Sequence, residues 1–273
     1  MFDSGRIPIR HKAQQAGIRA ACQLARDILL KTALEVHAGA TTAQIDRFAA
    51  AEIKAKGCKS AFLGYRGFPG TICISINEEV VHGIGSSRVI QDGDVVKIDI
   101  GIFRDGWVGD NALTVPIGKV AEETLKLLAA TEESLHVAID HARDGHMLGN
   151  LCASVEESVS QHGFTVVREF VGHGVGRKLH EEPQVPNYGT KGAKPRLKAG
   201  MTLAIEPMVN LGSAKTRILT DGWTVIAVDR KPSAHYEHVV LVTEGEPEIL
   251  TWRERMFPRG VADLNPVPVK LVL

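Results

Sequence analysis

The sequence has 273 residues, of which 44% are hydrophobic and 23% are charged, a composition typical of folded globular proteins rather than of disordered chains. Its 32 Lys and Arg residues balance 32 Asp and Glu residues, so the net charge does not indicate a partner that is nucleic acid or an anionic membrane. Apolar runs reach only four residues, which excludes a membrane-spanning helix of about 20 residues.

The start of the chain and its cysteines indicate the compartment. Residues Met1 to Arg6 lack the apolar core of a secretion signal. The cysteines are widely spaced and form no C-x-x-C pair, which excludes a zinc finger, and we expect reduced thiols at Cys22, Cys58, Cys73 and Cys152. We therefore expect a soluble, cytoplasmic protein.

The first half of the chain is predicted to form two helices followed by strands. Apolar residues recur with helical spacing across residues 9–37. A capping box of Thr41 and Gln44 opens a second helix, which ends before Gly57. Segments rich in β-branched residues predict strands at 71–76, 95–103 and 107–115, and the turn at 104–106 joins the last two in a hairpin.

The second half repeats this order. It contains a helical pattern over 120–143 and a further helix that Asn150 could cap. Strands are predicted at 165–170, 201–209, 223–228 and 237–242. Gly145 and Gly163 lie 106 positions after Gly39 and Gly57, which favours an internal duplication of an α+β unit, with coincidence as the alternative.

Four acidic residues lie in or beside apolar strands, two in each half: Asp99, Asp110, Glu206 and Glu237. A hairpin loop centred on Arg104-Asp105 would place Asp99 directly opposite Asp110, whereas a turn on Asp105-Gly106 would shift this pairing by one unless a bulge restored it. Like charges side by side repel, so the pair points to solvent or shares a cation. Four strand acids together favour a divalent metal site, which a pseudo-twofold axis would place at the centre.

Three histidines lie beside glycines or near them. His173 stands between Gly172 and Gly174, His180 follows seven residues later, and His82 precedes a glycine. Carboxylates with one imidazole suit Mn, Fe, Co or Zn. A metal pair can activate water and polarise a carbonyl group, so this pattern is typical of hydrolysis.

With these residues in the order Asp, Asp, His, Glu, Glu, the chain resembles the type I (bacterial-type) methionine aminopeptidases over residues 9–250. The resemblance is densest at 64–69, 73–78, 81–84, 172–185, 205–208 and 236–238. It implies the α+β pita-bread fold, with two pseudo-symmetric halves that each pack two helices on antiparallel strands. The expected catalytic domain spans 1–250, with halves at about 9–118 and 119–250. Residues 251–273 form a tail without an assigned function, expected to be an extended strap or partly mobile.

The resemblance also implies the metal ligands. Asp110 and Glu237 would bridge two divalent ions, whose identity (Co, Mn, Fe or Zn) the sequence leaves open. Asp99 would chelate one ion, and His173 and Glu206 would complete the other site.

By the same resemblance, Glu206 would shuttle a proton, His180 would stabilise the oxyanion and His82 would contact the scissile nitrogen. The side chain of the substrate methionine would lie among Phe62, Tyr65, Phe68, Cys73, Leu179 and Trp223.

The implied function is removal of the initiator methionine from nascent chains and peptides when the second residue is small. We expect a monomer that binds neither nucleic acid nor membrane, with Lys215 and Arg217 offering modest charge for ribosome contact. Two alternatives stay open: a proline-bond peptidase on the same scaffold, and a scaffold relative that has lost catalysis and only binds a partner. The intact set of five candidate ligands argues against the second alternative.

Overall fold

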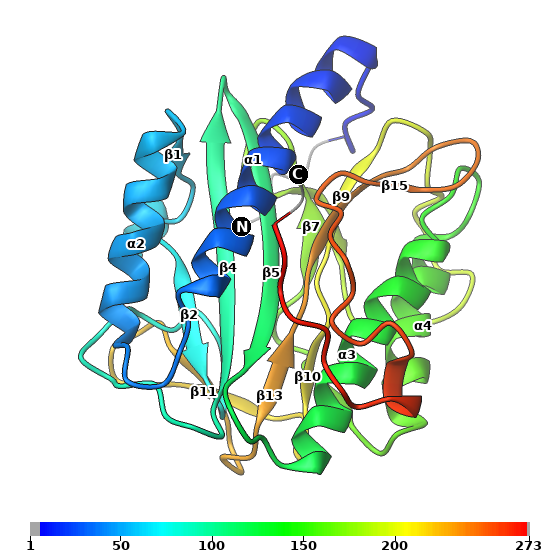
Figure 1. Ribbon diagram of the computed structural model, residues 1–273. Coiled ribbons are helices and arrows are strands. Elements are labelled where there is room, and N and C mark those ends of the chain that lie inside the picture. The colour runs from blue at the N-terminus through cyan, green and yellow to red at the C-terminus, as the bar shows by residue number, and fades with distance from the viewer. Residues whose placement is uncertain (1–5, 272–273) are drawn as a thin grey trace.

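A computed structural model describes residues 6–271 (Figure 1). In the first half, helix α1 (Lys12–Leu34) crosses the face of a long hairpin made of β4 (Val95–Arg104) and β5 (Trp107–Pro116). Helix α2 (Thr42–Ala55) lies beside it. The helical spacing of the apolar residues turns one face of α1 onto the hairpin, and that face is fully buried.

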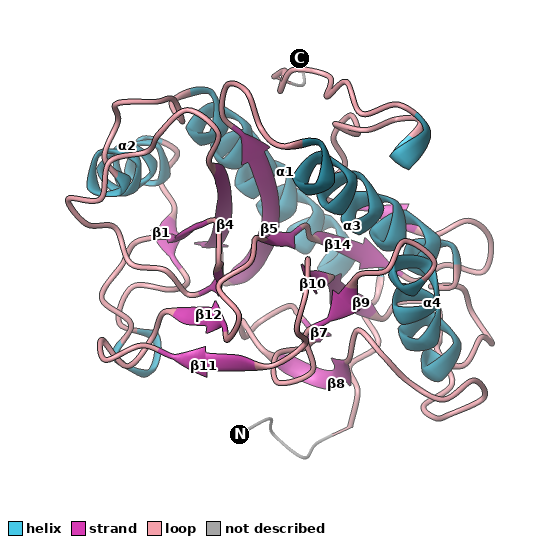
Figure 2. Ribbon diagram, turned by 90° about the horizontal axis from the view of Figure 1, so that it is seen from below, coloured by secondary structure: helices cyan, strands magenta, loops and turns pink. Residues whose placement is uncertain are grey.

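In the second half, α3 (Glu122–Asp140) and α4 (Leu148–Ser160) pack against each other and against the remaining strands. The other strands are β1 (Lys59–Ser60), β2 (Cys73–Ile76), β3 (Glu79–Val81), β6 (Thr165–Val166), β7 (Gly172–Gly174), β8 (Glu181–Val185), β9 (Thr202–Ile205), β10 (Met208–Asn210), β11 (Thr216–Ile218), β12 (Val225–Ala227), β13 (Ser233–His235), β14 (His238–Leu241) and β15 (Glu248–Ile249). Figure 2, a view from below, shows the α-helices along one side of the molecule and β8, β11 and β12 along the other.

The helix boundaries test the capping predictions. The capping box of α2 is confirmed: the Thr41 hydroxyl accepts the Gln44 N–H at 3.3 Å, and the Gln44 side chain accepts the Thr41 N–H at 2.7 Å. The prediction that Asn150 caps α4 is wrong, because the N-cap is Met147. Asn150 lies inside the helix, and its side-chain oxygen accepts the Gly192 N–H at 2.8 Å, so it anchors a distant loop.

The β4–β5 hairpin corrects the predicted register. The turn lies on Asp105-Gly106, which pairs Asp99 with Ala112 and Gly101 with Asp110. The two aspartates are therefore diagonal neighbours on one face of the hairpin rather than direct cross-strand partners. Both turn residues have positive φ angles, of 50° and 75°, which is the requirement of the tight hairpin turn that sets this register.

Five strands of the second half form a sheet in the order β15-β14-β9-β7-β8, and β10 lies in a three-stranded sheet with β6 and β13. The strand predicted over 201–209 is divided into β9 and β10 at Glu206-Pro207. Pro207 has no N–H to donate to a neighbouring strand, which explains the break. Glu206 is thereby placed in an irregular segment at the end of β9, where its side chain is free of the sheet pleat.

Hydrogen bonds join the two halves. The Glu237 N–H donates to the Ala112 carbonyl at 3.0 Å. The Thr114 hydroxyl donates to the His235 carbonyl at 2.8 Å and accepts the His235 N–H at 3.0 Å. The segment that leads into β14 therefore runs beside β5, which brings Glu237 next to Asp110.

The segment after Leu250 is packed against the core over much of its described length. Met256 and Phe257 are buried, and their N–H groups donate to the carboxylate of Glu132 on α3, at 3.1 and 2.8 Å. Arg253 forms a buried ion pair with the same carboxylate at 2.8 Å. The segment thus docks on α3 by buried contacts, and the division of the chain at 1–250 and 251–273 stays a prediction.

Two observations bear on the environment of the protein. All four cysteines are free and buried. Among residues 6–271, no helix combines the length and the apolar character needed to cross a bilayer.

The buried Glu132–Arg253 pair generates a stability prediction. We expect Glu132→Ala to lower the free energy of unfolding by about 3–5 kcal/mol, because it leaves the Arg253 charge buried without its partner. Glu157→Ala is the control, since the Glu157–Lys191 pair lies on the surface and is worth about 1 kcal/mol or less. Urea unfolding measures both, and equal losses would contradict the assigned role of Glu132.

Candidate active site

One cavity of about 310 Å³ is lined by residues of both halves. All the site residues predicted from the sequence line it: Phe62, Tyr65, Phe68, Cys73, His82, Asp99, Asp110, His173, Leu179, His180, Glu206, Trp223 and Glu237. The structure therefore brings the whole predicted set together, although the individual roles stay predictions.

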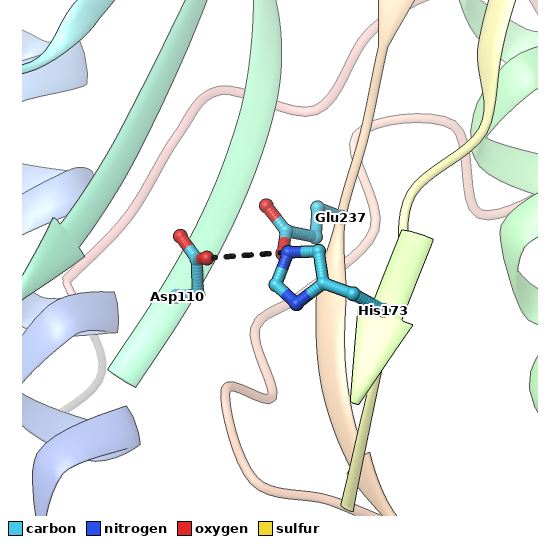
Figure 3. Close-up of side chains that lie close together, drawn as sticks. All are labelled: Asp110, His173 and Glu237. Carbon is cyan, nitrogen blue, oxygen red and sulfur yellow. Dashed lines mark ion pairs between the residues drawn. The ribbon is translucent and has the colours of Figure 1, made fainter. Parts of the chain in front are cut away.

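Three of these side chains form the tightest group. Asp110 on β5, His173 on β7 and Glu237 just before β14 each direct a ligand atom to one spot, and these atoms lie within 4.8 Å of one another (Figure 3). The His173 Nε2 atom is 3.8 Å from Asp110 Oδ2. All three residues are buried, and they come from segments that are far apart in the sequence.

The glycines around His173 explain how the ring reaches this spot. A side chain at Gly172 would clash with the Ala204 carbonyl, and one at Gly174 would clash with the Glu182 carbonyl. Only glycine allows β8 and β9 to approach β7 so closely. The Nδ1 atom of His173 lies 2.9 Å from the Gly174 carbonyl oxygen, so Nδ1 carries the ring proton. The lone pair of Nε2 then faces the carboxylates.

Asp99 and Glu206 complete the polar floor of the cavity. The Glu206 Oε1 atom is 3.5 Å from His173 Nε2. Asp99 lies on β4, on the same face of the hairpin as Asp110. Its Oδ1 atom is buried and has no hydrogen-bond donor, and the same holds for Asp110 Oδ1 and Glu237 Oε1.

These carboxylates are electrostatically incompatible in the absence of a cation. Burial raises the pKa of Asp110 to about 7. Burial, followed by the charges of the neighbouring acids, raises the pKa of Asp99, Glu206 and Glu237 well above the ordinary range. Buried acceptor atoms without donors, together with a neutral imidazole lone pair, are the ligand set that a divalent cation requires. The residues therefore fit a metal.

Two further imidazoles face the cavity. His82 follows β3 with a left-handed backbone (φ 60°), and its ring packs edge-on against Phe170, with a centroid distance of 5.3 Å. His180 Nδ1 is 2.8 Å from the Tyr65 hydroxyl. Burial lowers the pKa of His82 to about 4 and of His180 to about 3, so both rings are neutral near pH 7 and each can donate one N–H.

The apolar wall of the cavity is formed by the six residues predicted to hold a methionine side chain, all of which belong to one packed cluster. Phe68 and Trp223 pack edge to face, with ring centroids 5.2 Å apart. A flexible thioether is well accommodated by aromatic and sulfur-containing walls.

Sequence reasoning missed several residues of the site. Arg66, Glu169, Phe170 and Met208 also line the cavity. His235 is buried beside it, with Nε2 3.6 Å from Glu206 Oε2. The signal for His235 was its position two residues before Glu237, because alternate residues of an extended segment face the same side.

A family model described as "Metallopeptidase family M24" matches residues 16–244. The chain belongs to this family. As an M24 metallopeptidase it uses divalent metal, in agreement with the ligand set described above.

Individual relatives refine this placement. The chain is 49% identical over 216 residues to methionine aminopeptidase 1 of Bacillus subtilis. The aligned residues make up 79% of this chain and 87% of that protein. The methionine aminopeptidase structure from Thermotoga maritima is 39% identical and has a TM-score of 0.89, over 91% of this chain and all of that one. The resemblance to methionine aminopeptidases and the pita-bread fold are thereby confirmed.

A prolidase structure from Pyrococcus furiosus has the same fold. It is 24% identical, with a TM-score of 0.75, over 92% of this chain but only 66% of the prolidase chain. This likeness concerns the fold alone, and about a third of the prolidase chain has no counterpart in the present chain.

The raised carboxyl pKa values predict a pH-dependent metal affinity in this M24 protein. In the metal-free protein near pH 7 these carboxyls retain protons that a metal must displace, whereas His173, with a pKa of about 4, is already deprotonated. Affinity for Mn should therefore rise between pH 6.5 and 8. Calorimetric titration in two buffers of different ionisation enthalpy should show protons released on binding. Proton-neutral binding with equal affinity at both pH values would contradict this.

Proposed function

We propose that this M24 metallopeptidase removes the N-terminal methionine from peptides and nascent chains. The observation that carries the proposal is the single cavity in which an Asp/His/Glu metal-ligand group meets an apolar wall suited to a thioether. The similarity to methionine aminopeptidases supports the same activity.

For the metal centre, we propose two divalent ions drawn from Co, Mn, Fe and Zn. Asp110 and Glu237 would bridge them, since they come from opposite halves and face each other across the site. Asp99 would hold one ion, and His173 with Glu206 would hold the other, which is supported by the 3.5 Å approach of His173 to Glu206. When bound, such ions lower the pKa of water and polarise the scissile carbonyl.

The side chains of this protein would perform the proton transfers. Glu206 would take a proton at its carboxylate and pass it to the leaving amine. His180, oriented by the Tyr65 hydroxyl through Nδ1, would direct Nε2 at the developing oxyanion. His82, braced by Phe170, would contact the nitrogen of the scissile bond.

The remaining expectations are extensions of this proposal. A small second residue would be preferred, as in the family that the sequence resembles. The protein would be cytoplasmic, which is supported by its free cysteines, and it would act as a monomer. Ribosome contact would involve Lys215 and the exposed Arg217 on β11.

The activity is tested with the peptide Met-Ala-Ser. We expect methionine release that requires added Mn or Co and that stops when a chelator is added, because the site requires its cations. Release is measured by chromatography, with a Xaa-Pro dipeptide as the comparison substrate. Preference for the Xaa-Pro bond would instead favour a proline peptidase, and no turnover with any of the four metals would favour a non-catalytic scaffold.

Variants separate metal binding from proton transfer. Asp110→Asn and Glu237→Gln should lower both metal content and activity by more than about 100-fold, because a lost direct ligand costs more than a lost supporting group.

His82→Ala and His180→Ala are the matched changes. They should lower the rate by about 100-fold or more while metal content remains nearly intact. Metal analysis beside rate measurement distinguishes the two groups. Loss of metal in the histidine variants, or retained activity in the acid variants, would show that the roles are misassigned.

A further inference from the structure

A second cluster of polar side chains, each with buried nitrogen atoms, lies outside the active site, where the C-terminal segment meets α3 and β14. Its members are Arg253 and Arg255 of that segment, His136 of α3 and His238 of β14. The two histidine rings pack edge to face, with centroids 5.9 Å apart. Burial lowers the pKa of His136 to about 4, and the charge of Arg255 contributes to this shift. Burial also lowers the pKa of His238. Both rings beside the arginines are therefore neutral near pH 7.

The cluster carries an excess positive charge. Glu132 is the acid in contact with it, and its carboxylate already accepts from Arg253 Nη1 and from two backbone N–H groups. The exposed Glu254 lies 3.9 Å from Lys270 instead. Within residues 6–271, no acid lies within ion-pair distance of Arg255. Arg253 is buried and Arg255 is half-buried, and guanidinium atoms that are withdrawn from water without partners are costly.

The cluster also has more donors than acceptors. The Nε and Nη2 atoms of both Arg253 and Arg255 are buried and have no acceptor among the described residues. The Thr251 hydroxyl accepts the Val239 N–H and lies 2.9 Å from His238 Nδ1, so its hydrogen can be donated to that ring nitrogen. The other ring nitrogen of His238, Nε2, is buried and has no partner among the described residues.

A small cavity of about 10 Å³ is bordered by both arginines. The rest of its lining is Leu30, Leu113, Glu254, Met256 and residues 267–270. This is room for a single monatomic or water-like particle. A water molecule there would leave the guanidinium charges unbalanced, whereas a monatomic anion accepts N–H groups and also balances the charge.

We propose that Arg253 and Arg255 bind one small monovalent anion of the size of chloride. The anion would neutralise the excess guanidinium charge and would fasten the C-terminal segment to α3 and β14. The site is separate from the metal ligands, so it concerns the stability of this segment and is independent of the proposed aminopeptidase activity.

Bromide, which replaces chloride and scatters anomalously, locates the site directly. Crystals of the full chain soaked in sodium bromide should give an anomalous peak within hydrogen-bond distance of both Arg253 and Arg255. The absence of a peak at this position, with bromide bound at other places on the surface, would overturn the proposal and assign the donors to water.

Thermal unfolding tests the same site in solution. At constant ionic strength, exchange of gluconate for 0.3 M chloride should raise the midpoint of the wild-type chain by about 2–4 °C for a dissociation constant of roughly 50 mM. Arg255→Gln should abolish this shift. Arg259→Gln is the matched control, because Arg259 lies on the same segment with an exposed side chain, and it should retain the shift.

An equal chloride effect in all three proteins would indicate general screening, and no effect in the wild type would indicate no bound anion. Either result overturns the proposal. If Arg255→Gln fails to fold, the bromide peak in the wild-type crystal decides alone. Methionine release by the Arg255→Gln variant should equal that of the wild type, so failure of the anion site and failure of the proposed function can be told apart.

Discussion

The repulsion between carboxylates buried in one cavity is the constraint on which the site depends. Burial raises the pKa of Asp99, Asp110, Glu206 and Glu237, and the neighbouring acids raise it further at Asp99, Glu206 and Glu237. Such an arrangement is unfavourable in an empty protein and favourable around a divalent cation, because the cation supplies both the opposite charge and the missing bonds. His173 supports this interpretation, since its Nδ1 atom is occupied by a backbone carbonyl and its free lone pair faces the acids.

The fold supplies this arrangement by joining two halves along β5 and the segment before β14. The hydrogen bonds of Thr114 to His235 and of Glu237 to Ala112 fix the two segments side by side. One half then contributes a pair of aspartates on a hairpin, and the other contributes the glutamates and the imidazole. Neither half holds the ligand set alone, so the metal centre depends on the packing between them.

Much of this arrangement could be predicted from the sequence, because local patterns carry it. Lone acids in apolar strands indicated the ligands, and the Thr41 capping box fixed the start of a helix. The register of the hairpin was less certain, since Arg104-Asp105 and Asp105-Gly106 both suit a turn and differ by one pairing. The structure selects the second, so Asp99 and Asp110 are diagonal neighbours rather than direct partners.

What the sequence could not predict depends on contacts between distant segments. Asn150 has the chemistry of a helix cap but serves a loop some 40 residues away, at Gly192. Arg253 pairs with Glu132 although all the strands of the second half lie between these two residues in the sequence. No local pattern marks such pairs, because their partners are determined only when the chain has packed.

The position of the metal tests the central claim most directly. Crystals of the manganese-loaded protein, measured at the manganese absorption edge, should show anomalous density in contact with Asp110, His173 and Glu237 together. Density bound to side chains of one half alone, or at any other place in the molecule, would contradict the account.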